Sequence, residues 1–175
     1  MEKTRHDSAL NRFTLMDVTD RDFDSMCQIH VAAILAISNN YYRDEVKESW
    51  ARGLIPIGYA AGRSRGEHYR VLKSEGDDVL GFSSTQANEV VALYVNPKHQ
   101  GKGIGGALLQ DAEAQIRSNG ASAGNMTASL NAEPFYVSRG WQTQSQDEWK
   151  SRGGLMLPVV KMTKSFDSGS DRHVQ

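Results

Sequence analysis

A glycine-rich segment in the middle of the chain carries the residues best suited to chemistry. Residues 90–95 have the pattern of an apolar strand, Asn96 and Pro97 end it, and an amphipathic helix follows the glycines. Glycines permit positive φ and close approach of the backbone to a ligand, and the free N–H groups at a helix start attract anions. We therefore predict a phosphate or pyrophosphate site on the backbone of Gln100, Gly101, Lys102, Gly103, Ile104, Gly105 and Gly106.

Two common phosphate-binding patterns fit this segment poorly. Residues 101–106 satisfy G-x-G-x-x-G, but five residues separate the strand from the first glycine, and residues 114–132 contain no Asp or Glu to hold a ribose. A nucleotide-triphosphate P-loop needs Ser or Thr after its lysine, whereas Gly103 follows Lys102. The spacing therefore argues against both a dinucleotide site and a P-loop.

A third pattern fits at every specified position. Residues 100–105 match Q/R-x-x-G-x-G/A, and residues 132–141 match a second segment, A-x-x-F-Y-x-x-x-G-F, with Trp141 in place of the last Phe. On these two motifs the sequence resembles the GNAT-type N-acetyltransferase superfamily, over about residues 13–163. The resemblance implies a central, mostly antiparallel sheet of about six or seven strands flanked by about four helices.

The resemblance also implies direct transfer of an acetyl group from acetyl-CoA to a primary amine. Tyr136 occupies the position of the family's frequent general acid, and its other interpretation is a helix tyrosine packed on the sheet. Glu89 stands six residues before Val95, where the histone-acetylating branch has its catalytic glutamate. Strand alternation puts Glu89 on the face of Val91 and Leu93, unless a bulge intervenes. A water chain or a merely solvated Glu89 is the alternative to a carboxylate base.

Further cofactor contacts are expected on either side of the glycines. A strand that splays from its neighbour leaves backbone groups for the pantetheine arm, here at Leu93, Tyr94 and Val95. Many relatives carry Asn seven residues before the tyrosine, where this chain has Ser129. Asn131 either takes over that contact or caps the next helix. A lysine beside the loop, at 98 or 102, either adds charge near a phosphate or is a solvated surface charge.

The amine acceptor should bind between the first two helices and the strand hairpin. A histidine or aromatic residue in such elements is as easily part of the core as of a pocket wall. We find no metal-ligand spacing, so we predict no metal, and the single cysteine, Cys27, fits an inert buried thiol. The candidate pocket residues are His30, Tyr41, Tyr42, Trp50 and Tyr69.

The elements that position these residues follow from periodicity and turn signals. Thr19 and Asp22 form a capping-box pattern that starts the first helix, and residues 43–52 form a second short helix. Strands first and then a strand–helix–strand order indicate a mixed α+β sheet with helices on its faces. Later helices are expected at 103–119 and 133–139, and strands at 13–18, 68–73, 79–85, 89–95, 126–130, 141–149 and 155–163.

Length and charge bound the remaining possibilities. The 175 residues suit one domain, and 20 Lys and Arg against 21 Asp and Glu supply no global field for nucleic acid or an anionic membrane. We expect a flexible N-terminus at 1–11, one N-acetyltransferase domain at 12–163 and a flexible tail at 164–175. One cysteine, no secretory start and no apolar run of membrane-spanning length favour the cytoplasm.

These observations favour an acetyl-CoA-dependent N-acetyltransferase acting on a small-molecule or peptide amine. The alternative is a non-catalytic acyl-CoA-binding sensor or interaction module, which needs neither Tyr136 nor Glu89. No basic stripe supports nucleic-acid binding, and no nucleic-acid or membrane partner is expected. An exposed final strand at 155–163 would allow pairing with a second copy in a homodimer.

Overall fold

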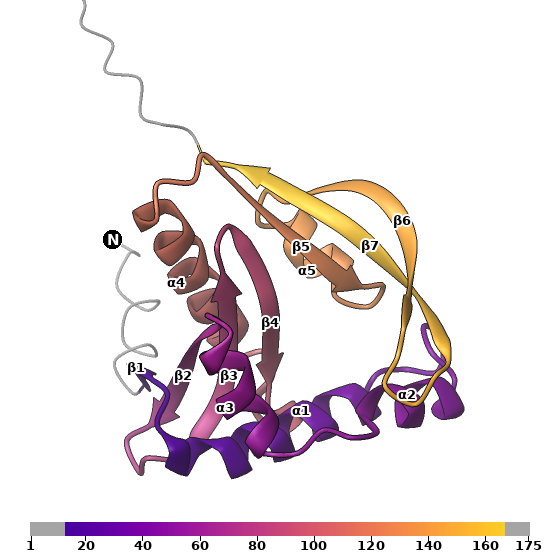
Figure 1. Ribbon diagram of the computed structural model, residues 1–175, viewed down its shortest axis with the longest axis horizontal. Coiled ribbons are helices and arrows are strands. Elements are labelled where there is room, and N and C mark those ends of the chain that lie inside the picture. The colour runs from indigo at the N-terminus through magenta and orange to yellow at the C-terminus, as the bar shows by residue number, and fades with distance from the viewer. Residues whose placement is uncertain (1–12, 167–175) are drawn as a thin grey trace, which may run out of the picture.

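The computed structural model describes residues 13–166 and shows a mixed α/β fold built on one seven-stranded sheet (Figure 1). The strand order is β1-β2-β3-β4-β5-β7-β6, antiparallel throughout except between β4 and β5. This confirms the predicted fold class. The strands are β1 (Phe13–Asp17), β2 (His68–Ser74), β3 (Val79–Gln86), β4 (Glu89–Val95), β5 (Ala123–Ser129), β6 (Gln142–Lys150) and β7 (Met156–Ser165).

Five α-helices lie among the described residues, one more than the sequence predicts. The helices are α1 (Phe23–Leu35), α2 (Asp44–Ala51), α3 (Ile57–Ser64), α4 (Ile104–Ser118) and α5 (Glu133–Val137), with short 3₁₀ turns η2 (Asp20–Asp22) and η3 (Pro97–His99). The unpredicted helix is α3, whose two glycines disfavour a helix in isolation. Packing favours Gly62 there, because a Cβ would clash with the Tyr69 hydroxyl and lie 2.7 Å from Glu67 Oε2.

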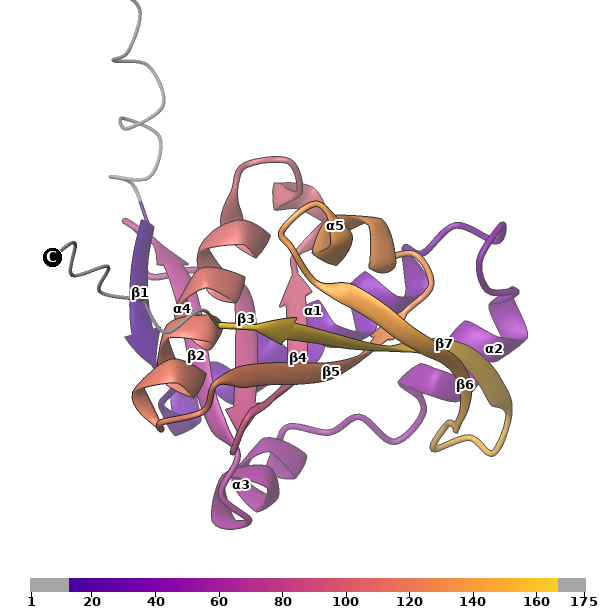
Figure 2. The same ribbon diagram turned by 90° about the horizontal axis from the view of Figure 1, so that it is seen from above.

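The helices cover both faces of the β2–β4 meander. Leu108 and Ile104 of α4 pack on Leu72 and Leu80 on one face, and Met26 of α1 packs with Phe82 on the other. Viewed from above, α5 and the start of α4 lie at one side of the molecule and α3 at the opposite side (Figure 2). These elements therefore lie at opposite ends of the strands β2, β3 and β4.

The carboxyl-terminal strands differ in two respects from expectation. The final strand β7 runs on to Ser165, Phe166 is buried, and β7 lies between β5 and β6. The edge strand is β6, so the expected pairing of an exposed final strand with a second copy is wrong, because β7 has neighbours on both sides. The predicted flexible N-terminus, 1–11, lies outside the described residues, as do residues 167–175 of the predicted tail 164–175, whereas residues 164 and 165 belong to β7.

A buried ion pair attaches the start of α1 to the sheet. The predicted capping box is present: Asp22 accepts from the Thr19 amide at 2.9 Å. Lys73 of β2 approaches the same carboxylate at 2.8 Å, and Asp22 is 4% exposed. Burial raises the pKa of Asp22, but hydrogen bonds from Lys73 and Thr19 outweigh it, so the pKa lies below its ordinary value. The ionised carboxylate therefore stabilises the fold at neutral pH.

Replacing Asp22 tests this attachment. Asp22→Asn leaves the Lys73 ammonium with the exposed Asp77 at 3.1 Å as its remaining acidic partner, so the free energy of unfolding should fall by about 2 kcal/mol at pH 7. Because the folded-state pKa is depressed, the contribution is present above the unfolded value near 3.8 and is lost as pH falls through the folded pKa. Urea unfolding should therefore show a difference between parent and variant that is constant from pH 5 to 7 and narrows below pH 4. A difference that does not change with pH would contradict the pair.

Candidate active site

The two middle strands meet at one end and then diverge. β4 pairs with β5 at two positions alone, Glu89↔Asn125 and Val90↔Met126. An amide of Asn125 donating to the Asn88 carbonyl at 3.0 Å closes this end. Beyond it, β4 has β3 on one edge and no strand on the other (Figure 1). A cavity of about 560 Å³ occupies the opening and is lined by both strands, by α1 and by the β6–β7 turn.

A β-bulge changes the direction in which Glu89 points. Ser84 opposes Ala92 and Thr85 opposes Val90, so Val91 is an extra residue on β4. As a result Val90 and Leu93 both face α4, and Ala92 faces α1. The expected side for Glu89, that of Val91 and Leu93, is therefore wrong. Glu89 lies on the α1 face with Ala92, is half-buried, and lines the cavity.

Tyr136 lines the same cavity from α5. Its side chain is buried, stacked edge-on to Phe135 and Trp141, and burial raises the pKa of its hydroxyl. No residue of the range 13–166 hydrogen-bonds to that hydroxyl. A phenol that stays protonated and has no protein partner is suited to donating a proton to a ligand.

The cofactor candidates on the strands divide into lining and non-lining residues. Leu93, Tyr94 and Ser129 line the cavity, whereas Val95 does not. Asn131 lies just past β5, and its side-chain oxygen is buried and accepts no hydrogen bond within the described part of the chain. Because buried polar atoms are normally paired, that oxygen is available to a ligand's donor.

The predicted glycine loop lies outside this cavity, at the start of α4. Gly101 and Gly103 have φ values of +74° and +82°, which other residues rarely adopt, and Gly105 is pressed against Phe135, 3.3 Å from an ideal Cβ. Within residues 13–166, no acceptor takes a hydrogen bond from the amides of Gly101 to Gly106. The backbone of residues 100–106, including Gln100, Lys102 and Ile104, thus offers several free N–H donors at a helix N-terminus.

The sequence did not single out Arg139, which lies beside this loop. Its guanidinium is 3.3 Å from the position of a Cβ on Gly106 and lies over the Phe135 ring at 3.9 Å. Lys102, within the loop, has its Nζ 3.2 Å from His99 Nδ1. Arg139 stands inside the second motif, at a position that the motif leaves unspecified, so its type alone could have marked it as an anion contact.

Three of the five predicted pocket residues line the cavity. His30 of α1, Trp50 of α2 and Tyr69 of β2 are part of its wall. Tyr41 is exposed, and Tyr42 is buried outside the lining. The Tyr42 hydroxyl accepts from the Leu130 amide at 2.8 Å and donates to the Pro158 carbonyl at 2.6 Å. Tyr42 therefore holds the ends of β5 and β7 together instead of contacting a ligand in the cavity.

His30 is neutral in this environment. Burial, together with the positive charge of Arg152, lowers the pKa of His30 to about 3. Its Nδ1 lies 3.1 Å from the Tyr59 hydroxyl, and its ring centroid is 3.9 Å from that of Tyr94. The imidazole is thus a fixed polar contact and not a group that changes charge near pH 7.

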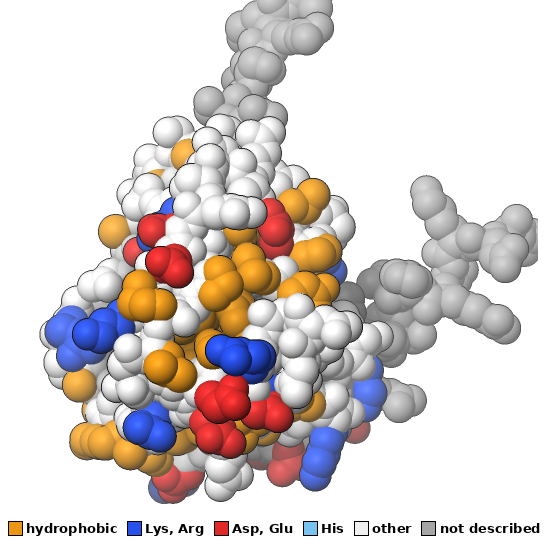
Figure 3. Space-filling model, turned by 90° about the vertical axis from the view of Figure 1, so that its right-hand side faces the viewer, with side chains coloured by type: hydrophobic (Ala, Val, Ile, Leu, Met, Phe, Trp, Pro, Cys, Tyr) orange, Lys and Arg blue, Asp and Glu red, His pale blue; other side chains and the backbone are white. Residues whose placement is uncertain are grey.

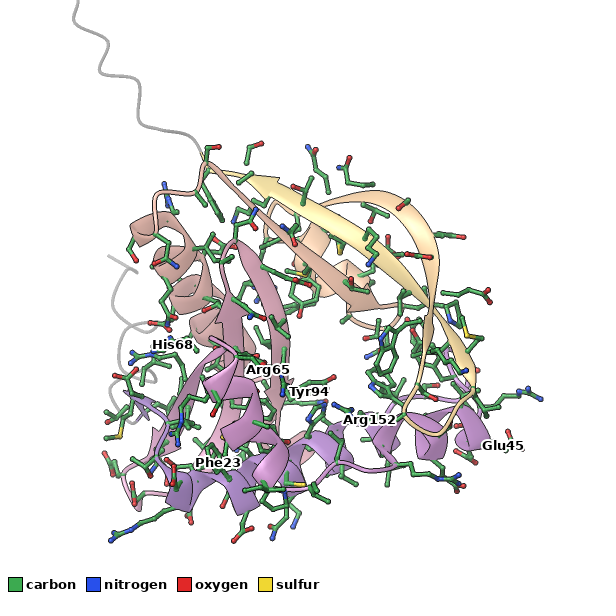
Figure 4. All side chains as sticks on the ribbon, in the orientation of Figure 1. Phe23, Glu45, Arg65, His68, Tyr94 and Arg152 are labelled. Atoms are coloured by element: carbon green, nitrogen blue, oxygen red, sulfur yellow. The ribbon has the colours of Figure 1, made fainter. Side chains whose placement is uncertain are left out.

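Several lining residues were not predicted. Figure 4 labels two of them, Arg65 after α3 and Arg152 on the β6–β7 turn. Glu67 accepts from the Ser84 hydroxyl at 2.6 Å, and burial together with this carboxylate raises the pKa of Tyr69. These residues lie in the turns before β2 and β7 and reach the cavity from there. Since they belong to no motif and no periodic segment, the sequence gives no signal for them.

Residues 13–166 contain neither a candidate metal site nor a candidate membrane-spanning helix. No group of three or more His, Cys, Asp or Glu side chains is arranged to hold a metal ion. No helix of that range has the length and apolar character to cross a membrane.

Known proteins resemble the chain in both sequence and fold. The Escherichia coli (strain K12) protein "Uncharacterized N-acetyltransferase YafP" is 25% identical over 150 residues, which are 82% of this chain and 91% of that protein. A GCN5-related N-acetyltransferase structure from Rhodopseudomonas palustris matches with a TM-score of 0.81 and 27% identity, over 87% of this chain and 95% of the other. PaiA N-acetyltransferase from Thermoplasma acidophilum, solved with coenzyme A, matches with a TM-score of 0.70 and 18% identity, over 88% and 99%.

The match to a family covers most of the described structure. Residues 42–166 fit the family described as "Acetyltransferase (GNAT) domain", and this range contains both motifs, the diverging strands and all of the cavity wall except His30. The prediction of an acetyltransferase from two short motifs is thereby confirmed. The chain belongs to the GNAT acetyltransferase family.

Proposed function

We propose that the protein transfers the acetyl group of acetyl-CoA directly to the primary amine of a small molecule or peptide. The observation that carries the proposal is the divergence of β4 and β5 after two paired residues. It leaves an unpaired backbone edge at Leu93 and Tyr94, in one cavity with Tyr136 and Glu89. The thioester would lie along this edge, so both side chains have access to the reacting atoms.

The glycine loop would bind the pyrophosphate of the cofactor. The free amides of Gly101 to Gly106 and the positive end of α4 favour an anion. Lys102 within the loop and Arg139 beside it add positive charge. The pantetheine arm would pass Ser129, which lines the cavity, and the unpaired side-chain oxygen of Asn131 would accept a hydrogen bond from it. The coenzyme A complex of the Thermoplasma relative supports this assignment through its shared fold.

The residues of the cavity divide the proton transfers between them. Glu89 would accept a proton from the ammonium group of the acceptor, so that a neutral amine attacks the thioester carbon. A backbone N–H of the β4 edge would donate to the oxygen that becomes negative in the tetrahedral intermediate. As the carbon–sulfur bond breaks, Tyr136 would protonate the leaving thiolate. The nitrogen of the intermediate would lose its second proton to solvent, and Tyr136 would recover a proton from the same solvent. Acetylated amine and free coenzyme A thiol are the balanced products.

Removing the Tyr136 hydroxyl tests the acid. Tyr136→Phe keeps the buried ring, so coenzyme A binding measured by calorimetry should be unchanged, while kcat falls about 10²- to 10³-fold. Tyr41→Phe, which removes a hydroxyl outside the cavity, should leave kcat unchanged. A parent protein that binds acetyl-CoA but releases no thiol with any amine of a broad panel would favour the non-catalytic binder instead.

Glu89→Gln tests the base. The amide has the same shape but cannot accept a proton, so kcat/KM at pH 7 should fall about 10²-fold. The loss should shrink at high pH, where a larger fraction of the acceptor amine is already neutral. A loss below about threefold at pH 7 would assign proton removal to water and not to Glu89.

Gly103→Ala tests the loop. A side chain at φ +82° costs about 1 kcal/mol of strain and shifts the amides that follow, so KM for acetyl-CoA should rise about tenfold. Gly120→Ala is the matched control, because Gly120 follows the other end of α4 at φ +84° and also has nothing within 4 Å of a Cβ. The two variants should lose similar stability in thermal unfolding, and equal KM effects would contradict a pyrophosphate site at the loop.

A further inference from the structure

The turn between β6 and β7 is fixed to α2 by hydrogen bonds to one residue, Ser49. Its hydroxyl lies 2.6 Å from that of Ser151 and accepts from the Leu155 amide at 3.2 Å, and its carbonyl accepts from the Gly153 amide at 2.9 Å. A Cβ on Gly153 would lie 2.7 Å from the Ser49 Cα, so another residue would not fit. The backbone on both sides of Arg152 therefore has a defined position.

From this turn Arg152 reaches into the cavity opening. Figure 4 shows its side chain directed from the β6–β7 turn toward Tyr94, and Arg152 is part of the cavity wall. Its positive charge acts on the pKa of His30, second to burial. Arg152 is thus placed near His30 and Tyr94 in the cavity wall.

Arg152 is also without an acidic partner in the described part of the chain. No Asp or Glu of residues 13–166 lies within 4.0 Å of its guanidinium. Arg70, by contrast, contacts both Asp17 and Asp111, and the lining residue Lys161 contacts Asp147 and the Thr127 hydroxyl. A guanidinium held by a rigid turn and left unpaired presents its planar fork to a ligand carboxylate.

The surfaces around Arg152 are apolar and largely aromatic. The Trp50 and Trp149 rings meet edge to face at 6.5 Å next to the turn, and Tyr59 packs on Phe82 at 5.8 Å farther in. Figure 3 looks onto this side of the molecule and shows hydrophobic side chains gathered at its centre with charged side chains near them. The lining carboxylates, Glu67 and Glu89, come from the β2–β4 side of the opening.

This arrangement has Arg152 on one side, Glu67 and Glu89 with the nearby Arg65 on the other, and an apolar wall between them. We infer that the acceptor is an apolar or aromatic amine that carries a free carboxylate, of the amino-acid class, and that Arg152 binds the carboxylate. The inference rests on the proposed function and narrows it. The guanidinium would bind the carboxylate end of the acceptor, and the apolar wall would pack against the acceptor's side chain. The ammonium group is then directed to the β4 side, where Glu89 lies.

The test compares acceptors that carry the carboxylate with acceptors that lack it. L-phenylalanine, phenylalaninamide and phenethylamine share one aromatic body, and only the first has a free carboxylate. In the parent, kcat/KM should favour L-phenylalanine over the other two by about 10- to 100-fold, the range of one charge-assisted pair. Arg152→Gln should reduce that ratio to near one, through KM, and Arg152→Lys should restore part of it.

Direct binding gives a readout that does not depend on turnover. Calorimetry with the coenzyme A-loaded protein should detect L-phenylalanine binding, and Arg152→Gln should weaken it about tenfold or more. Lys150→Gln, which removes a charge from the same hairpin outside the cavity lining, should leave both affinity and the kinetic ratio unchanged.

The outcomes separate this inference from the proposed function. Equal kcat/KM values for the three acceptors, or an equal loss for all three in Arg152→Gln, would overturn the carboxylate site while leaving an active acetyltransferase. Turnover of other amines without binding of L-phenylalanine, L-leucine or L-tyrosine would overturn it as well. Failure of coenzyme A itself to bind would overturn the proposed function, and with it the inference about the acceptor.

Discussion

The short contact between β4 and β5 is the constraint on which the rest of the structure depends. Two residue pairs align the strands, and beyond them the hydrogen bonds between β4 and β5 end, which leaves an open edge on β4. Buried backbone groups without partners cost free energy, so such an opening persists only where other elements hold the strands apart. The Val91 bulge bends β4 at the point of divergence, and it also turns Glu89 toward the cavity.

Two hydroxyl groups hold the far side of the opening. Tyr42 bridges the Leu130 amide and the Pro158 carbonyl, which fixes the ends of β5 and β7 to the loop between α1 and α2. Ser49 holds the β6–β7 turn against α2. Both contacts join residues more than 80 positions apart in sequence. The width of the cavity is therefore set by long-range hydrogen bonds and not by the strands that line it.

This division explains what the sequence could predict. The positions of the strands, of α4 and of the capping box at Thr19 follow from periodicity, glycines and caps, which are local signals. α3 escapes prediction because Gly62 is selected by its contact with Tyr69 and Glu67. In the same way, the face of β4 on which Glu89 lies depends on a bulge, because one extra residue reverses the alternation of the side chains. No residue type in the sequence predicts that bulge.

The candidate site follows the same rule. Its motif residues were found because backbone conformation at Gly101 and Gly103 restricts the residue type. Arg152, Glu67 and Tyr59 reach the cavity through tertiary contacts, so their types carry no signal at their positions. Tyr41 and Tyr42 were predicted to line the pocket, but they do not. Adjacent aromatic residues are equally compatible with a pocket wall and with a structural role, and only the hydrogen-bond partners of the Tyr42 hydroxyl identify its role as structural.

The distribution of charge in the cavity is consistent with transfer between two ligands. The inner groups, His30 and Tyr136, are buried and uncharged near pH 7, since burial lowers the pKa of the first and raises that of the second. The charged lining residues Arg152 and Glu89 come from the β6–β7 turn and from the start of β4. A neutral interior keeps the local dielectric low, which strengthens the interaction of backbone N–H groups with a developing oxyanion. Charges at the periphery can then orient an ionic acceptor without neutralising the groups that act on the thioester.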